Sequence, residues 1–129
     1  MKRLKENSVL FSFGGLTYGI IEILWRRYTH WSMIITGGVC FLLLFRIFNK
    51  AQRLTLLKKC LIGSGVITSI EFAVGVVVNI ILKMDVWDYS SMPFNLWGQV
   101  CPLYSLLWGI LTIPISYLCS KMKKVVKKI

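Results

Sequence analysis

Residues 61–82 read LIGSGVITSIEFAVGVVVNIIL, an apolar run in which the only charged side chain is that of Glu71. At ~1.5 Å per residue, a helix of this length is about 33 Å long, enough to cross a hydrocarbon core of about 30 Å. Backbone amides find no water to bond with at that depth, so such a segment must form its hydrogen bonds internally. The run therefore predicts a transmembrane helix.

Three further apolar segments accompany this run, at about residues 8–25, 31–48 and 99–120. The 129-residue chain is 56% hydrophobic and has a positive mean hydropathy, which is too apolar for a soluble domain of this size. We expect an all-α polytopic membrane protein with four transmembrane helices arranged as two hairpins. All of residues 1–129 are expected to form one domain, with residues 83–98 as the longest outer loop.

Lys and Arg residues are distributed unevenly among the connections. Thirteen of the 16 lie at the N-terminus, in the second loop with its flank (which includes Arg46), or at the C-terminus, and the others are Arg26, Arg27 and Lys83. The positive-inside rule then places both termini in the cytoplasm. Basic residues confined to the gaps between apolar runs suit lipid headgroups rather than nucleic acid, so the net charge of +11 predicts the lipid bilayer as partner.

Two nine-residue stretches resemble each other: residues 14–22 read GGLTYGIIE and residues 63–71 read GSGVITSIE. The repeat predicts two hairpins related by an axis along the membrane normal, and a chance match in a chain rich in Gly and Ile is the alternative.

Small and polar residues also recur at helical spacing, which predicts close helix packing. These stripes are Gly15, Gly19, Glu22 and Arg26; Ser64, Thr68, Glu71, Gly75 and Asn79; and Pro102, Ser105, Gly109, Thr112, Ser116 and Ser120.

Packing does not explain the two carboxylates within the apolar segments. A carboxylate near the membrane midplane, as expected for Glu71, costs a few kcal/mol and should face protein or water. Glu22 lies nearer the outer end of its segment, where an ion pair with Arg26 at i+4 is the alternative interpretation. Either carboxylate is a candidate proton or cation site. The full set of candidate binding residues is Glu22, Glu71, Tyr18, Arg26, Asn79, Trp87, Asp88 and Asn95.

The outer loop is rich in turn-forming and aromatic residues. Asp88 and Asn95 are suited to turns capped by their own side chains, and Trp87 and Trp97 to immersion in the membrane interface. The sequence contains no nucleophile–base pair, phosphate loop or metal cluster, so we expect neither an enzyme nor a cofactor or metal. The cysteines lack zinc spacing and are interpreted as packing residues: Cys40, Cys60, Cys101 and Cys119.

Several short motifs together resemble one family of small bacterial membrane proteins, known as putative ABC-transporter type IV or CmpB-like. The matching residues are Tyr18-Gly19-x-x-Glu22, the run from Trp25 to Met33, Gly37-Gly38-x-Cys40-Phe41, Glu71, Trp87-Asp88-Tyr89-Ser90, Pro93-Phe94-Asn95 and Trp108-Gly109. The resemblance implies a four-helix, multi-pass protein of the bacterial cytoplasmic membrane. Since this chain has no phosphate-binding loop, any ATPase would be another polypeptide.

Two classes of function remain open at this point. The first is a small transporter or transporter-like binding protein, in which Glu22 and Glu71 line a polar cavity for a small molecule or ion beneath the outer loop. The second is a non-catalytic scaffold or subunit that binds a partner protein or lipid, and self-association fits both classes. An exporter of the small multidrug-resistance type is a further alternative, but its dual-topology members need a weaker charge bias than thirteen against three.

Overall fold

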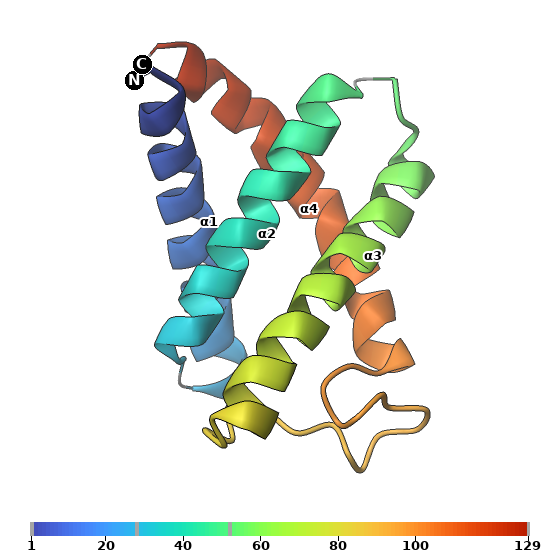
Figure 1. The fold of residues 1–129 in the computed structure, drawn as a ribbon. Helices are drawn as coiled ribbons and strands as arrows, with labels where there is room; N and C mark the ends of the chain where they lie inside the picture. Colours follow the sequence, from blue (N-terminus) through green and yellow to red (C-terminus); the bar gives the residue numbers. More distant parts are fainter. Residues whose placement is uncertain (1, 28, 52, 129) are drawn as a thin grey trace. The chain divides into compact units, whose positions relative to one another are not determined.

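The computed structural model describes residues 2–27, 29–51 and 53–128, and this part of the chain is all-α (Figure 1). Its helices are α1 (Lys2–Arg26), α2 (Trp31–Lys50), α3 (Leu56–Gly75) and α4 (Pro102–Lys127), and a π-helix, η1 (Val76–Ile81), continues α3. The helices α1, α2, α3 with η1, and α4 are each long and apolar enough to cross a membrane. The predicted all-α polytopic fold is confirmed.

The chain divides into two compact units. Unit 1 consists of Met1–Leu54 and Pro114–Ile129, so it holds α1, α2 and the second half of α4. Unit 2 is Thr55–Ile113, with α3, η1, the connection 82–101 and the first half of α4. The division within α4 coincides with Pro114, which has no N–H and cannot donate the hydrogen bond that would continue the helical ladder.

Glycines allow α1 and α2 of unit 1 to approach closely as an antiparallel hairpin (Figure 1). A Cβ added at Gly14 would collide with the Cβ of Phe41 and lie 2.9 Å from its Cγ. A Cβ at Gly37 would collide with the Cβ of Tyr18 in the same way. Small residues are therefore required on both helices at positions outside the predicted stripe. Within the stripe, a Cβ at Gly15 would lie 2.7 Å from the carbonyl oxygen of Ile34.

The two helices of unit 2 also meet through small residues. A Cβ at Gly63 of α3 would collide with the side chain of Thr112, whose own exposure is 0%. On α4, a Cβ at Gly109 would come 3.4 Å from the carbonyl oxygen of Cys60. Three of the six stripe positions on α4 therefore lie against α3, namely Ser105, Gly109 and Thr112.

The helices do not end where the apolar runs end. Helix α1 already begins at Lys2, before the apolar run starts at about residue 8. Helix α4 begins at Pro102, later than residue 99, because proline suits the first turn of a helix. It then continues past residue 120 to Lys127, and one side of this extension stays buried at helical spacing through Ser116, Cys119, Met122 and Val126.

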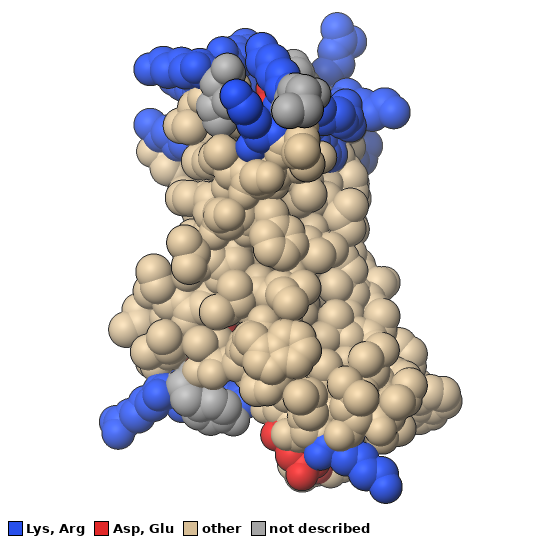
Figure 2. Space-filling model, turned by 60° about the vertical axis from the view of Figure 1, so that its left-hand side comes forward, with Lys and Arg blue, Asp and Glu red and all other residues tan. Residues whose placement is uncertain are grey.

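Charged side chains gather at the helix ends, and the surface between them is almost entirely uncharged on the face shown in Figure 2. In unit 1, the beginning of α1 and the end of α4 lie at the same end (Figure 1). In unit 2, Lys58 and Lys59 lie in the first turn of α3, and Lys83 follows η1. Such a distribution is expected for helices whose middle portions face hydrocarbon.

Candidate functional site

Glu22 lies on the buried side of α1 and is 7% exposed. The Nη1 atom of Arg26, one turn further on, lies 3.3 Å from the Oε1 atom of Glu22. On the same side of the helix, Cβ atoms added at Gly15 and Gly19 would contact Ile34 of α2. The interpretation of Glu22 and Arg26 as a local ion pair is confirmed, and so is the shared face with the glycines.

Tyr18 belongs to the same row of α1, since residues four apart stack along a helix. Its Cβ lies against Gly37 of α2, so its backbone end is fixed by the close approach of the two helices. The structure therefore brings three candidate residues, Tyr18, Glu22 and Arg26, together along one side of α1.

Glu71 is the most deeply buried carboxylate among the described residues, at 3% exposure. Thr68 and Ser64 precede it by three and seven residues, so all three lie on one side of α3. That side carries a seam of hydroxyl groups shared with α4. Ser64 Oγ donates to the carbonyl oxygen of Ser105 at 2.7 Å, and Thr68 Oγ1 lies 2.8 Å from Ser105 Oγ. No Lys or Arg occurs in the sequence between Lys59 and Lys83.

A compact hydrogen-bond network closes unit 2 at the end of η1, and we call Asn79, Trp87 and Gln99 the loop latch. Asn79 Nδ2 donates to Gln99 Oε1 at 2.7 Å, while Asn79 Oδ1 accepts from the backbone N–H of Val86 at 2.7 Å. Trp87 Nε1 donates to the carbonyl oxygen of Gln99 at 2.9 Å. The latch thus ties the connection 82–101 to the helix.

Two local features of the helix allow the connection to come this close. A Cβ at Gly75 would lie 2.6 Å from Gln99 Oε1 and 2.9 Å from Trp87 Cζ2, so any larger residue would force the latch side chains to shift. The following turn is the π-helix η1, a wider turn that occurs frequently at functional sites. It ends with the backbone N–H of Leu82 bonded to the carbonyl oxygen of Val77 at 2.9 Å.

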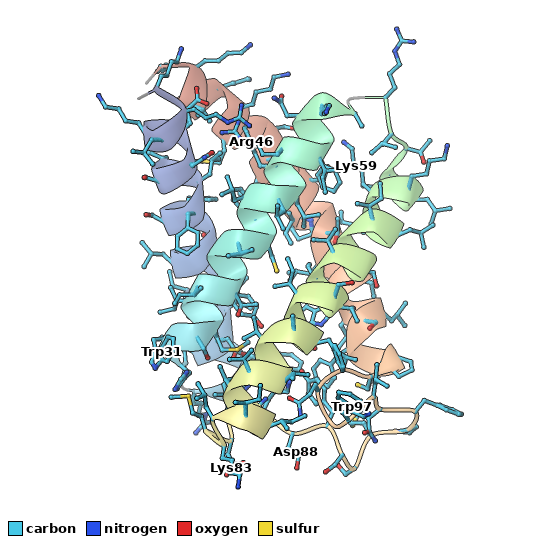
Figure 3. The ribbon with its side chains drawn as sticks, viewed as in Figure 1. Trp31, Arg46, Lys59, Lys83, Asp88 and Trp97 are labelled. Carbon is cyan, nitrogen blue, oxygen red and sulfur yellow. The ribbon has the colours of Figure 1, made fainter. Side chains whose placement is uncertain are left out.

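Side chains also build the turns within the connection, as predicted. Asp88 Oδ1 accepts from the backbone N–H of Ser90 at 2.8 Å, and Asn95 Oδ1 accepts from that of Gly98 at 2.9 Å. Phe94 and Trp97 adopt left-handed backbone conformations, with φ of 58° and 55°. Such conformations strain a side chain with a Cβ and persist only where surrounding bonds enforce them. Figure 3 shows Asp88 and Trp97 on this connection.

The prediction that Trp87 lies in the membrane interface is wrong. Trp87 is 6% exposed and packs against Gly75, because its indole N–H finds a partner inside the latch. Trp97 is 68% exposed, and Trp25 and Trp31 of unit 1 are 70% and 55% exposed, as interfacial side chains should be.

The eight candidate residues therefore fall into two groups. Tyr18, Glu22 and Arg26 lie in unit 1, and the other five lie in unit 2. The latter are Glu71, Asn79, Trp87, Asp88 and Asn95. The side-chain amide of Asn79 is engaged at both its oxygen and its nitrogen, so this residue positions the loop.

Sequence reasoning missed Gln99, which is 4% exposed and holds the centre of the latch. The only signal was a polar residue at the start of an apolar run. Among the described residues, no three His, Cys, Asp or Glu side chains are grouped so that they could hold a metal ion.

The four apolar helices define the class of the protein: it is a multi-pass membrane protein. The chain belongs to the family described as "Putative ABC-transporter type IV", whose model matches residues 9–129. The resemblance carried by the sequence motifs is thereby confirmed, and with it the placement of the chain among transporter-like membrane proteins. No curated protein and no solved structure matches the chain.

Proposed function

We propose that this protein is a small transporter-like protein of the bacterial cytoplasmic membrane, in which Glu71 is the group that responds to a proton or cation. One observation carries the proposal: Glu71 is 3% exposed in the middle of an apolar helix and shares its side with a hydroxyl seam. A carboxylate at membrane depth costs a few kcal/mol, so a chain that keeps one there needs a compensating role for it.

The chemistry around Glu71 favours a proton or a hard cation as the species that it binds. Ser64, Thr68 and Ser105 offer only oxygen atoms along the seam. Oxygen ligands suit hard cations, and a carboxylate in an apolar setting is readily neutralised by a proton. The transported or bound substrate would then be a small molecule or an ion whose binding changes the occupancy of Glu71.

We propose further that the protein acts by binding and not by covalent catalysis. Its one histidine, His30, caps the start of α2 by accepting a hydrogen bond from the backbone N–H of Ser32 at 3.2 Å. The seam beside Glu71 contributes hydroxyls and no imidazole or amine that could act as a base for them.

The proposed orientation has both termini in the cytoplasm. Two observations support it: thirteen of 16 Lys and Arg residues lie in the three segments assigned to the cytoplasm, and the beginning of α1 and the end of α4 lie at the same end of unit 1. The connection 82–101 would then face the outside, on the side of η1 that is remote from the first turn of α3.

The test is a flux measurement on protein reconstituted in liposomes that contain a pH-sensitive dye. A sodium gradient and a pH gradient are imposed in separate experiments, and the proton flux is recorded for wild type, Glu71→Gln and Asp85→Asn. Asp85 is an exposed carboxylate outside the helices, so Asp85→Asn removes the same chemical group without touching the seam. We expect the flux to vanish in Glu71→Gln and to persist in Asp85→Asn.

Equal flux in wild type and Glu71→Gln would refute the role of Glu71, and the absence of flux from wild type under both gradients would refute transport. Glu22→Gln is measured beside them. Since Glu22 is paired with Arg26, we expect this variant to keep at least half of the wild-type flux.

One observation favours the scaffold function as the second candidate. The polar side chains of the outer connection are used for bonds within unit 2, as Asp88 and Asn95 show. A rigid outer surface of this kind suits docking of a partner membrane protein or a second copy of the chain. In that case Glu71→Gln would change the mass of the purified assembly, measured by light scattering after size exclusion, and not a flux.

A further inference from the structure

One end of unit 1 carries a dense group of basic side chains, which we call the basic end. In unit 1, the Lys and Arg residues at the end that holds the two termini come from three helices (Figure 2). The members are Lys2, Arg3 and Lys5 of α1; Arg46 and Lys50 of α2; and Lys121, Lys123, Lys124, Lys127 and Lys128 at the end of α4. Glu6 is the only acidic residue of unit 1 besides Glu22.

The single acid at the basic end is already used. Arg46 Nη2 lies 3.6 Å from Glu6 Oε2 and donates a hydrogen bond to Asn7 Oδ1 at 2.5 Å. This bridge ties α1 to α2 and neutralises Glu6. Among the described residues of unit 1, no other Asp or Glu lies near the lysines at this end, so an outside anion is the natural source of compensating charge.

The lysines at the end of α4 are held on a helix. Helix α4 is ~39 Å long by its 26 residues, longer than the ~30 Å hydrocarbon core, so its final turns reach the headgroup layer. Lys123 and Lys127 are four residues apart on α4, and Lys128, in the turn that follows the helix, is four residues from Lys124, which gives two short rows of charge. The opposite side of the same turns is buried, at 7% exposure for Met122.

Apolar side chains interleave with these charges and distinguish a lipid surface from a soluble partner. Leu4 is 63% exposed among the lysines of α1, and Val125 is 46% exposed among those of α4. Lys121 Nζ lies 5.3 Å from the centroid of the Tyr117 ring, so this lysine folds along an apolar neighbour. Mixed basic and apolar surfaces of this kind suit the boundary between headgroups and acyl chains.

We propose that the basic end is a binding site for anionic phospholipid headgroups, and that a headgroup with two phosphates binds more tightly than a headgroup with one. The two lysine rows of α4 offer places for two phosphates, and Lys2 and Lys5 of α1 belong to the same end. The site does not include Glu71, so this proposal and the proposed transport function can be tested separately.

The test is a lipid titration of the full-length protein in detergent, followed by native mass spectrometry. The probes are tetraoleoyl cardiolipin, dioleoyl phosphatidylglycerol and dioleoyl phosphatidylcholine. The variant Lys124→Gln/Lys127→Gln removes two charges from the basic end. The matched control Arg27→Gln/Lys83→Gln removes two charges outside it. Lys124→Arg/Lys127→Arg keeps the charge at the same positions.

We expect cardiolipin to bind wild type most tightly and phosphatidylcholine most weakly. Each basic residue near an anionic lipid contributes a factor of roughly five, so cardiolipin affinity should fall at least ~10-fold in Lys124→Gln/Lys127→Gln. It should stay within ~3-fold of wild type in the control and in the arginine variant. Both lysines are exposed, so the melting temperature without added lipid should be unchanged, which separates lost binding from lost folding.

Three outcomes would overturn the proposal. Equal cardiolipin affinity in the lysine variant and the control would remove the basic end as the site. Equal binding of phosphatidylcholine would show that the acyl chains alone are recognised. Displacement of cardiolipin by soluble glycerophosphate, or retention of an acidic soluble protein in place of lipid, would assign the site to a free phosphate or to a protein partner.

Discussion

The first helix of each unit contains a similar nine-residue stretch, but the carboxylate at the end of the stretch has different surroundings in the two units. In unit 1, the stretch 14–22 starts with a glycine against Phe41 and ends with Glu22 beside Arg26. In unit 2, the stretch 63–71 starts with a glycine against Thr112 and ends with Glu71 on a hydroxyl seam. The facing helix makes the difference: α2 presents aromatic rings and glycines, whereas α4 presents hydroxyls. The shared sequence pattern therefore places a glycine at each helix contact, while the facing helix determines whether the surroundings of the carboxylate are apolar or polar.

The largest expected effect is a loss of stability caused by a substitution in the apolar hairpin of unit 1. Gly14→Ala should reduce the free energy of unfolding by about 2–3 kcal/mol, because the new methyl group collides with the Cβ of Phe41, which no rotamer change can move. SDS titration in mixed micelles measures this loss. The matched control is Gly65→Ala, where a Cβ meets nothing within 4 Å and should stabilise the helix slightly. Equal losses in the two variants would mean that Gly14 is not a packing glycine.

An intermediate effect is expected in unit 2, where a substitution should loosen the connection 82–101 and leave the hairpin of unit 1 unchanged. Asn79→Ala removes the donor to Gln99 and leaves the N–H of Val86 without its acceptor, at a cost of about 1–3 kcal/mol. Hydrogen exchange in nanodiscs should show faster exchange of the amides of residues 82–101. The amides of α1 and α2 should be unaffected. Unchanged exchange in the connection would show that the latch does not hold it.

The smallest expected effect concerns the ion pair of unit 1. A double-mutant cycle with Glu22→Gln and Arg26→Gln should give a coupling energy of about 0.3–1 kcal/mol, since the Arg26 side chain is 24% exposed and the pair is local. The cycle is measured by SDS titration at two salt concentrations. A coupling energy above ~3 kcal/mol would contradict the interpretation of Glu22 and Arg26 as a weak local ion pair.

Most of the fold could be predicted because it depends on simple periodicities. The apolar runs predicted the number and approximate places of the helices, and small residues at spacings of three and four predicted some of the close approaches, such as those at Gly15 and Gly109. The i+4 spacing of Glu22 and Arg26 predicted their pair. The turns at Asp88 and Asn95 were also predictable, since these side chains bond to nearby backbone groups. Each of these features is encoded within a few residues.

The features that escaped prediction depend on residues that are distant in sequence. The burial of Trp87 requires Gly75 and Gln99, which lie twelve residues away on either side. A π-helix differs from an α-helix in that each backbone N–H bonds to the carbonyl group five residues earlier instead of four, and Val76–Ile81 carries no periodic signal that distinguishes the two. The extension of α4 to Lys127 arises from buried side chains on one side of a segment whose composition is basic.

The division of α4 at Pro114 has a consequence for the order in which the protein can be assembled during translation. Unit 2 is continuous in sequence, but unit 1 needs both its first 54 residues and Pro114–Ile129. Ribosomes add about 5–20 residues per second, so the first hairpin waits roughly 3–12 s while the whole of unit 2 is synthesised. During that interval the nascent α1–α2 hairpin lacks its third helix, and insertion factors have a defined window in which to shield it.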